Sequence, residues 1–260
     1  AARQTGPAVP LPNAVARPGE DLDEVLVDGE RRPAEGAQGR AVSPTDGGKD
    51  SALLAAARDG NAEAVLELLS KGANPEAQDD RERTALILAA GLGHEDVARQ
   101  LLTAKTDPNA RDVNLRTPLF HAAHSGHTSV CTLLLSPRYE ADIDAEDGGN
   151  WTALLCAAYR GESECVAVLA DAGANVNARD FRDWTPLIWA THESEDGCVH
   201  VLLEKRAHVN IQDFTGMTAL SRAAQDGRSD IVGRLLEHKA KVDIRDFEKK
   251  TALMEASRRG

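Results

Sequence analysis

One phrase recurs along the chain at a nearly constant interval, and this period limits the fold more than any other feature of the sequence. The phrase reads RTALILAAGLGH from residue 83 and RTPLFHAAHSGH from residue 116. Counting back 33 residues from the first threonine of the phrase reaches Ser51, so a hydroxyl residue opens seven successive units. Repeats of this length predict a linear stack of small supersecondary units. The threonines, separated by 33, 35, 33, 33 and 33 residues, are Thr84, Thr117, Thr152, Thr185, Thr218 and Thr251.

Each unit has the residue types of two short helices followed by a turn. The opening Thr or Ser suits a helix N-cap, and Pro118 and Pro186 follow it at the first helical position, where no backbone N–H is needed. An apolar, Ala-rich helix then ends at a glycine such as Gly93 or Gly161, and a second helix carries apolar residues at helical spacing. A polar stretch that ends in Asp closes the unit as a turn. Two such helices cannot bury an apolar face alone, so neighbouring units are expected to stack.

The period, the TPL…AA..GH phrase and endings such as GANVNARD resemble ankyrin repeats over residues 46–260. The resemblance implies an all-α solenoid in which each L-shaped unit has paired antiparallel helices and a hairpin-like finger at right angles to them. Fingertips and inner helices would form a concave face. In this family that face most often binds other proteins.

Some units depart from the family pattern, and each departure predicts a local irregularity. The His that usually follows TPL is absent, which predicts less regular fingers, and two extra residues in SPRYEADIDAED predict a bulged loop in the third unit. Ser194 takes the place of the interhelix glycine in the fifth unit, which predicts a distorted turn. Three basic residues stand where Gly72 and Gly173 end the second helix, which costs stability if the backbone there is left-handed. They are Lys105, Arg206 and Lys239.

Residues 1–45 have a different composition, rich in Pro, Gly, Ala and charge, and show no sustained period. This composition predicts a disordered segment before the repeats. Its apolar stretch DLDEVLV, residues 21–27, is either a residual patch in a linker or a short docking motif. The absence of an initial Met and the end within the seventh unit predict that the chain is part of a longer protein.

Charge and composition exclude several classes of partner. The net charge of −12 and pI near 5.1 argue against general binding to nucleic acid or anionic membranes and slightly favour a basic partner. No apolar stretch is long enough to cross a membrane, and no signal peptide opens the chain. The four cysteines include no CxxC pair and are expected to be free thiols, most of them small buried side chains. We therefore expect a monomeric protein of the cytoplasm, with the nucleus as an alternative.

Motifs for catalysis and for bound cofactors are absent from the sequence. The Gly-Lys pair in TDGGKDS lacks the earlier glycine of a phosphate loop, and neither HExxH nor GxSxG occurs. His121, His124 and His127 lie close in sequence, but no carboxylate or thiolate completes an evident ligand set. The sequence therefore predicts a chain that is not an enzyme and holds no metal or cofactor.

Aromatic residues recur at two positions of the finger, and the family geometry implies that both face outward. One position directly precedes the capping threonine and the other directly follows the closing Asp, whereas Trp189 lies within a first helix and is expected in the core. The rings either pack on the next finger and stiffen the stack, or they form a binding stripe. The residues expected to contact a partner are Trp151, Tyr159, Arg160, Phe181, Arg182, Trp184, His192, Phe214, Met217, Gln225 and Phe247.

These observations favour a non-catalytic scaffold or adaptor that binds a protein or peptide on the face of fingers and inner helices. An alternative is that the chain is the regulatory or substrate-recruiting part of a larger enzyme, such as a kinase or ubiquitin ligase. A third possibility follows from the resemblance, because asparaginyl hydroxylases modify the finger Asn of such repeats. The residues at that position are Asn109, Asn177 and Asn210.

Overall fold

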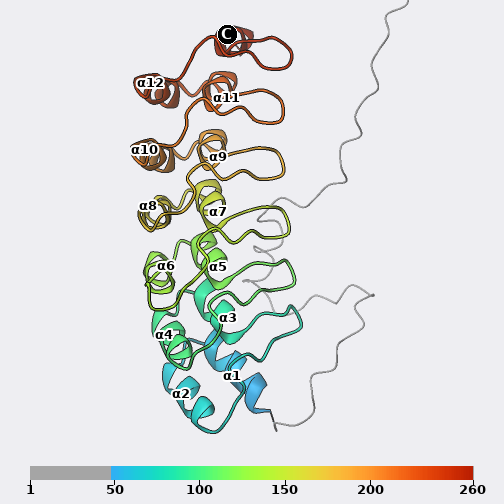
Figure 1. Cartoon of the computed structure of the whole chain (residues 1–260), viewed down its shortest axis with the longest axis vertical. Coiled ribbons are helices and arrows are strands. Elements are labelled where there is room, and N and C mark those ends of the chain that lie inside the picture. The colour runs from blue at the N-terminus through green and yellow to red at the C-terminus, as the bar shows by residue number, and fades with distance from the viewer. Residues whose placement is uncertain (1–47, 260) are drawn as a thin grey trace, which may run out of the picture. The chain divides into compact units, whose positions relative to one another are not determined.

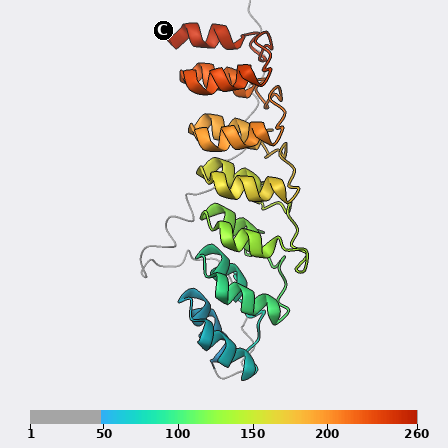
Figure 2. The same cartoon turned by 90° about the vertical axis from the view of Figure 1, so that its left-hand side faces the viewer.

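The computed structural model describes residues 48–259, and the regular elements of this part of the chain are all helices. Odd-numbered helices form an inner column beside the projecting fingers, and even-numbered helices form an outer column (Figure 1). The layers of this stack follow one another in sequence order (Figure 2). The predicted all-α repeat stack is therefore confirmed, whereas the predictions for residues 1–45 lie outside the described residues.

The helices are seven to ten residues long and alternate between the two columns. The helices are α1 (Lys49–Arg58), α2 (Ala62–Ser70), α3 (Ala85–Gly91), α4 (Glu95–Thr103), α5 (Pro118–His124), α6 (Thr128–Leu134), α7 (Ala153–Arg160), α8 (Ser163–Asp171), α9 (Pro186–Glu193), α10 (Asp196–Glu204), α11 (Ala219–Asp226), α12 (Ser229–Glu237) and α13 (Ala252–Arg259). The inner helices α3 to α11 each pack against the inner helices before and after them as well as against their own outer helix.

The capping threonines begin five inner helices as the sequence predicts. In α3, for example, Thr84 Oγ1 accepts a hydrogen bond of 3.3 Å from the backbone N–H of Ile87, and Thr117, Thr152, Thr185 and Thr218 do the same in their units. The prediction for the first unit is wrong, because Ser51 lies inside α1 and the helix begins at Lys49, after Gly48. No Asp-ended finger precedes α1 in the described residues to hold Ser51 in the extended cap conformation.

The interhelix turn keeps its geometry even where glycine is replaced. Gly93 and Gly227 have φ of 77° and 70°, and Ser194 adopts φ of 67° at the same place in the fifth unit. The prediction of a distorted turn is therefore wrong, because serine takes the left-handed conformation at an energetic cost of about 1–2 kcal/mol. The two extra residues of the third unit lie after α6, where the N–H of Tyr139 donates to the carbonyl of Ser136.

Asp residues fix the fingers in a common shape. Asp112 Oδ1 accepts hydrogen bonds from the backbone N–H groups two and four residues later, Asn114 and Arg116, both at 2.9 Å. Asp79, Asp147, Asp180 and Asp213 make the same pair of bonds in their fingers. This arrangement needs no His after TPL, so the fingers keep a regular turn although that His is absent.

Polar side chains near the base of each finger join it to the next one. Asn109 Oδ1 accepts from the backbone N–H of Asp142 at 2.7 Å, and Asn177 and Asn210 accept in the same way from the following units at 2.8 Å. Glu76 and Asp144 do so where the sequence has no Asn. Because these bonds link consecutive units, the three asparagines have a structural role. Their proposed hydroxylation stays a prediction.

The basic residues at the end of the second helix have the predicted left-handed backbone: φ is 66° at Lys105, 62° at Arg206 and 66° at Lys239. Replacing Lys105 by glycine is expected to raise the free energy of unfolding by about 0.5–1 kcal/mol, because removal of Cβ relieves more strain than the entropy of glycine costs. Urea unfolding followed by circular dichroism measures the change. Lys71→Gly is the control, since Lys71 has φ of −83° and gains nothing; equal destabilisation of both variants would contradict the expectation.

Candidate partner-binding face

The finger position before the capping threonine points inward rather than to solvent. Trp151 and Trp184 are only 2% and 4% exposed, and Met217 is also buried, so the prediction that these residues face outward is wrong. The backbone N–H of each residue is held by the finger Asp, with bonds of 3.0 Å from Trp151 to Asp147 and 2.9 Å from Trp184 to Asp180. Their rings pack over the inner helices as part of an aromatic cluster.

The aromatic cluster joins the fourth and fifth units, and Trp189 on α9 is at its centre. The centroid of Trp189 lies 4.3 Å from that of Trp184, 4.9 Å from Trp151 and 5.2 Å from Tyr159. His192, one turn further along α9, lies edge-on to Trp184 at 5.1 Å. The indole N–H groups of Trp151 and Trp184 have no acceptor in the described residues, so ring packing is what holds these two side chains. The prediction that Trp189 belongs to the core is confirmed.

In three units the residue four positions after the capping threonine contacts the Asp of the preceding finger segment. His121 Nε2 lies 2.8 Å from Asp112 Oδ2, Trp189 Nε1 donates to Asp180 Oδ2 at 2.9 Å, and Arg222 forms an ion pair with Asp213. The three donors differ, but each satisfies the second oxygen of a buried carboxylate. The guanidinium of Arg222 also lies 4.4 Å from the ring centroid of Trp184. The sequence analysis did not predict this contact between finger and inner helix.

Burial and hydrogen bonds shift the pKa values of two of these carboxyl groups in opposite directions. Burial would raise the pKa of Asp112, but hydrogen bonds from His121 and from two backbone N–H groups outweigh it and hold that pKa below its usual value. Burial prevails at Asp180, where the neutral indole of Trp189 is the side-chain donor, and the pKa of Asp180 is raised. Buried, hydrogen-bonded carboxyl groups therefore lie between the fingers and the inner helices.

The other aromatic position of the finger faces solvent, as predicted. Phe181, Phe214 and Phe247 are 45%, 51% and 76% exposed, and they occupy the same position in three consecutive fingers. Backbone bonds fix these fingers against one another: the N–H of Phe214 donates to the carbonyl of Arg182 at 3.2 Å, and that of Phe247 donates to Thr215 at 3.1 Å. The Arg182 guanidinium lies 5.1 Å from the ring of Phe181. We call these three rings the Phe row.

The remaining predicted contacts lie at the ends of inner helices. Tyr159 and Arg160 are the last two residues of α7. His192 is the last residue but one of α9, and Gln225 has the same place in α11. Arg160 and His192 are exposed, whereas Tyr159 and Gln225 are half-buried. His192 lies between two carboxylates, 3.9 Å from Glu193 and 3.5 Å from Asp226. The Phe row together with these helix ends is called the finger face.

Several histidine and cysteine side chains have structural partners. His94 and His127 each bond a backbone carbonyl of the preceding unit, and His124 Nδ1 lies 3.3 Å from the thiol of Cys156. Burial raises the pKa of Cys156 and of Cys198 to about 12, so neither is a thiolate at neutral pH. Within residues 48–259, no group of three His, Cys, Asp or Glu side chains is arranged to hold a metal.

No helix in the described part of the chain is both long enough and apolar enough to span a membrane. The repeat stack, its Asp-held fingers and its capped inner helices define a helical repeat protein. A model of the ankyrin repeat family matches residues 53–147, 139–213 and 198–260, and the chain belongs to this family. Comparison of the sequence with curated proteins gives no match.

Two solved structures show the same architecture. The ankyrin repeat domain of Bcl-3, described as a unique member of the IkappaB protein family, superposes with a TM-score of 0.73 at 29% identity, covering 80% of this chain and 94% of that domain. The human ASB11 ankyrin repeat domain superposes with a TM-score of 0.71 at 27% identity, covering 78% and 90%. Domains of this fold are generally protein–protein interaction modules and are typically non-catalytic.

Proposed function

We propose that this chain binds a protein or peptide on the finger face, with the Phe row as its main contact. One observation carries the proposal: three of the four phenylalanines of the chain are exposed, and all three occupy one position in consecutive fingers. Lone exposed apolar residues are ordinary, but a row of aromatic rings is typical of interaction surfaces. Covering the exposed part of each ring would stabilise a complex by roughly 1 kcal/mol.

Features around the row support its use as a binding surface. The fingers are held by Asp side chains and by backbone bonds to their neighbours, so their ordering costs little when a partner binds. The buried aromatic cluster fixes the finger between α8 and α9 to α9, and so fixes the position of Phe181. Arg160, Arg182 and His192 provide a polar rim. The partner's identity, a monomeric state and a cytoplasmic location stay predictions, as does a regulatory role within a larger enzyme.

Alanine substitutions in the Phe row test this function. Replacing Phe181, Phe214 and Phe247 together is expected to abolish partner capture from native lysate, while each change alters the free energy of unfolding by no more than about 0.5 kcal/mol because the rings are exposed. Affinity purification with quantitative mass spectrometry measures the captured proteins. Leu66→Ala is the matched control, since Leu66 is a similarly exposed apolar residue on α2. The proposal fails if the triple variant and the control capture the same proteins as the parent chain.

A further inference from the structure

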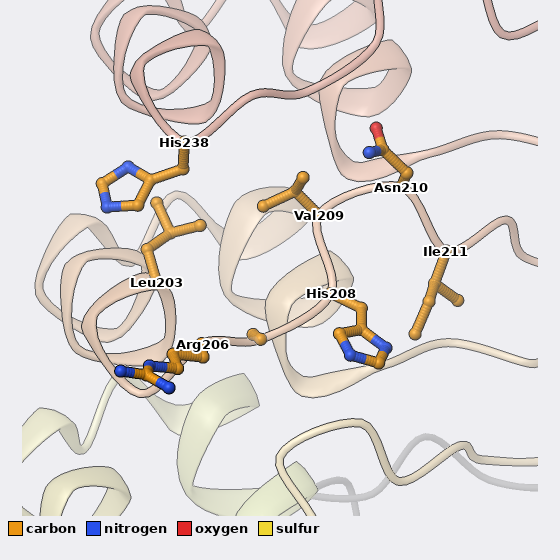
Figure 3. Close-up of a pocket in the computed structure, with 8 residues that line it drawn as sticks. Leu203, Arg206, His208, Val209, Asn210, Ile211 and His238 are labelled. Carbon is orange, nitrogen blue, oxygen red and sulfur yellow. The ribbon is translucent and has the colours of Figure 1, made fainter.

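A cavity of about 590 Å³ lies between the end of α10, the segment that follows it, and the end of α12 (Figure 3). Its volume is within the range of ligand-binding pockets. None of its lining residues belongs to the finger face. The cavity is therefore a separate feature of the fifth and sixth units.

The lining of this cavity combines apolar side chains with nitrogen-containing ones. Leu203, Val209 and Ile211 provide apolar lining, whereas Arg206, His208 and His238 bring nitrogen-containing side chains to it. No Asp or Glu lines the cavity, although the chain has 42 acidic residues and a net charge of −12. The lining therefore favours an apolar group that carries negative charge.

The polar lining is partly fixed and partly exposed. His238 Nδ1 lies 2.9 Å from the carbonyl of Arg234, which must accept, so this nitrogen carries the proton and the ring is held in place. Arg206 and His208 are exposed, so the cavity opens to solvent beside them. An open rim of this kind suits a side chain presented by a polypeptide better than a fully enclosed small molecule.

We propose that this cavity is a second docking site, which takes an apolar side chain from an acidic segment of a partner protein. The apolar side chain packs on Leu203, Val209 and Ile211. One carboxylate of the segment pairs with the guanidinium of Arg206, and another accepts a hydrogen bond from a ring N–H of His208. The stack then has two interaction surfaces, the finger face and this cavity, and a partner could use both.

The repeat provides replacements that the fold already accepts. In the fourth unit the positions equivalent to Arg206, His208 and His238 are occupied by Gly173, Asn175 and Ala172. Gly173 has φ of 99°, so glycine also suits the left-handed backbone at position 206. The triple variant Arg206→Gly, His208→Asn, His238→Ala removes the polar lining and is expected to keep the fold. Lys105→Gly makes the matching glycine change away from the cavity.

The test uses two N-acetylated tetrapeptide amides, the acidic Glu-Leu-Phe-Glu and the neutral Gln-Leu-Phe-Gln, titrated into the ¹⁵N-labelled full chain. The acidic peptide is expected to shift the amide signals of residues 206–211 and of His238, and to bind about fivefold more tightly than the neutral one, which is the scale of a few exposed ion pairs. The triple variant should lose this preference, and Lys105→Gly should retain it. Binding should weaken between 50 and 500 mM salt.

Two results would overturn the proposal: equal affinity for the two peptides, or unchanged affinity in the triple variant. Shifts confined to other parts of the chain would overturn it as well. A chain with alanine at Phe181, Phe214 and Phe247 should bind the acidic peptide as the parent does. This variant separates the two surfaces, so failure of the cavity site leaves the finger face untouched and failure of the finger face leaves the cavity site untouched.

Discussion

Replacing Trp189 by alanine is expected to lower the free energy of unfolding by about 4 kcal/mol, because large buried aromatic side chains cost about 3–5 kcal/mol on truncation. The ring contacts Trp151, Trp184 and Tyr159, so its loss opens a cavity between the fourth and fifth units. It also removes the side-chain donor to the buried carboxyl of Asp180. Thermal and urea unfolding followed by circular dichroism measure the loss. Hydrogen exchange should show that protection falls first in these two units.

Trp189→Phe separates packing from hydrogen bonding at this position. Phenylalanine keeps most of the ring contacts and loses only part of the volume and the N–H donor, so we expect a loss of about 1–2 kcal/mol. Arg222→Leu, which removes the side-chain donor to Asp213 in the next finger, should leave protection around α7 unchanged. A loss below about 1 kcal/mol for Trp189→Ala would contradict the central position of Trp189 in the cluster.

Replacing Gly93 by alanine is expected to lower the free energy of unfolding by about 3 kcal/mol. Gly93 has φ of 77°, and an added Cβ would lie only 2.7 Å from Nδ1 of His127. The left-handed backbone alone costs an alanine about 1 kcal/mol. The remainder comes from displacing His127, whose other nitrogen bonds the carbonyl of Gly91 at 3.1 Å. Urea unfolding measures the change.

Gly72→Ala is the matched control for this steric argument. Gly72 has φ of 84°, but an added Cβ there would meet no atom within 4 Å. We therefore expect only the conformational cost of about 1 kcal/mol at Gly72. Equal losses at Gly72 and Gly93 would show that the contact with His127 contributes nothing to stability.

Most of the fold could be predicted from the sequence because the repeat shows each local signal several times. The capping threonines, the interhelix glycines and the left-handed positions of Lys105 and Arg206 lie where the alignment of units places them. The wrong predictions concern units in which the preceding finger is missing from the described residues or in which another residue replaces the usual glycine. Ser51 has no preceding finger in the described residues, and Ser194 adopts the glycine conformation instead of distorting the turn.

The candidate site was only partly predictable, because an alignment gives the position of a side chain but not the direction in which it points. Phe214 and Trp184 both belong to a finger, yet the first faces solvent and the second lies under Arg222. In three fingers the pairing of the Asp with a donor nine residues later could have been found. His121, Trp189 and Arg222 all have a side-chain N–H group at that position.

Photocrosslinking from the Phe row tests the proposed function most directly. The chain would carry benzoylphenylalanine at position 214 or, as a control, at position 66, which is similarly exposed on α2. Irradiation in native lysate is expected to give a discrete adduct with a partner protein from position 214 and none from position 66. An adduct of the same partner from position 66 only, or from both positions equally, would contradict binding on the finger face.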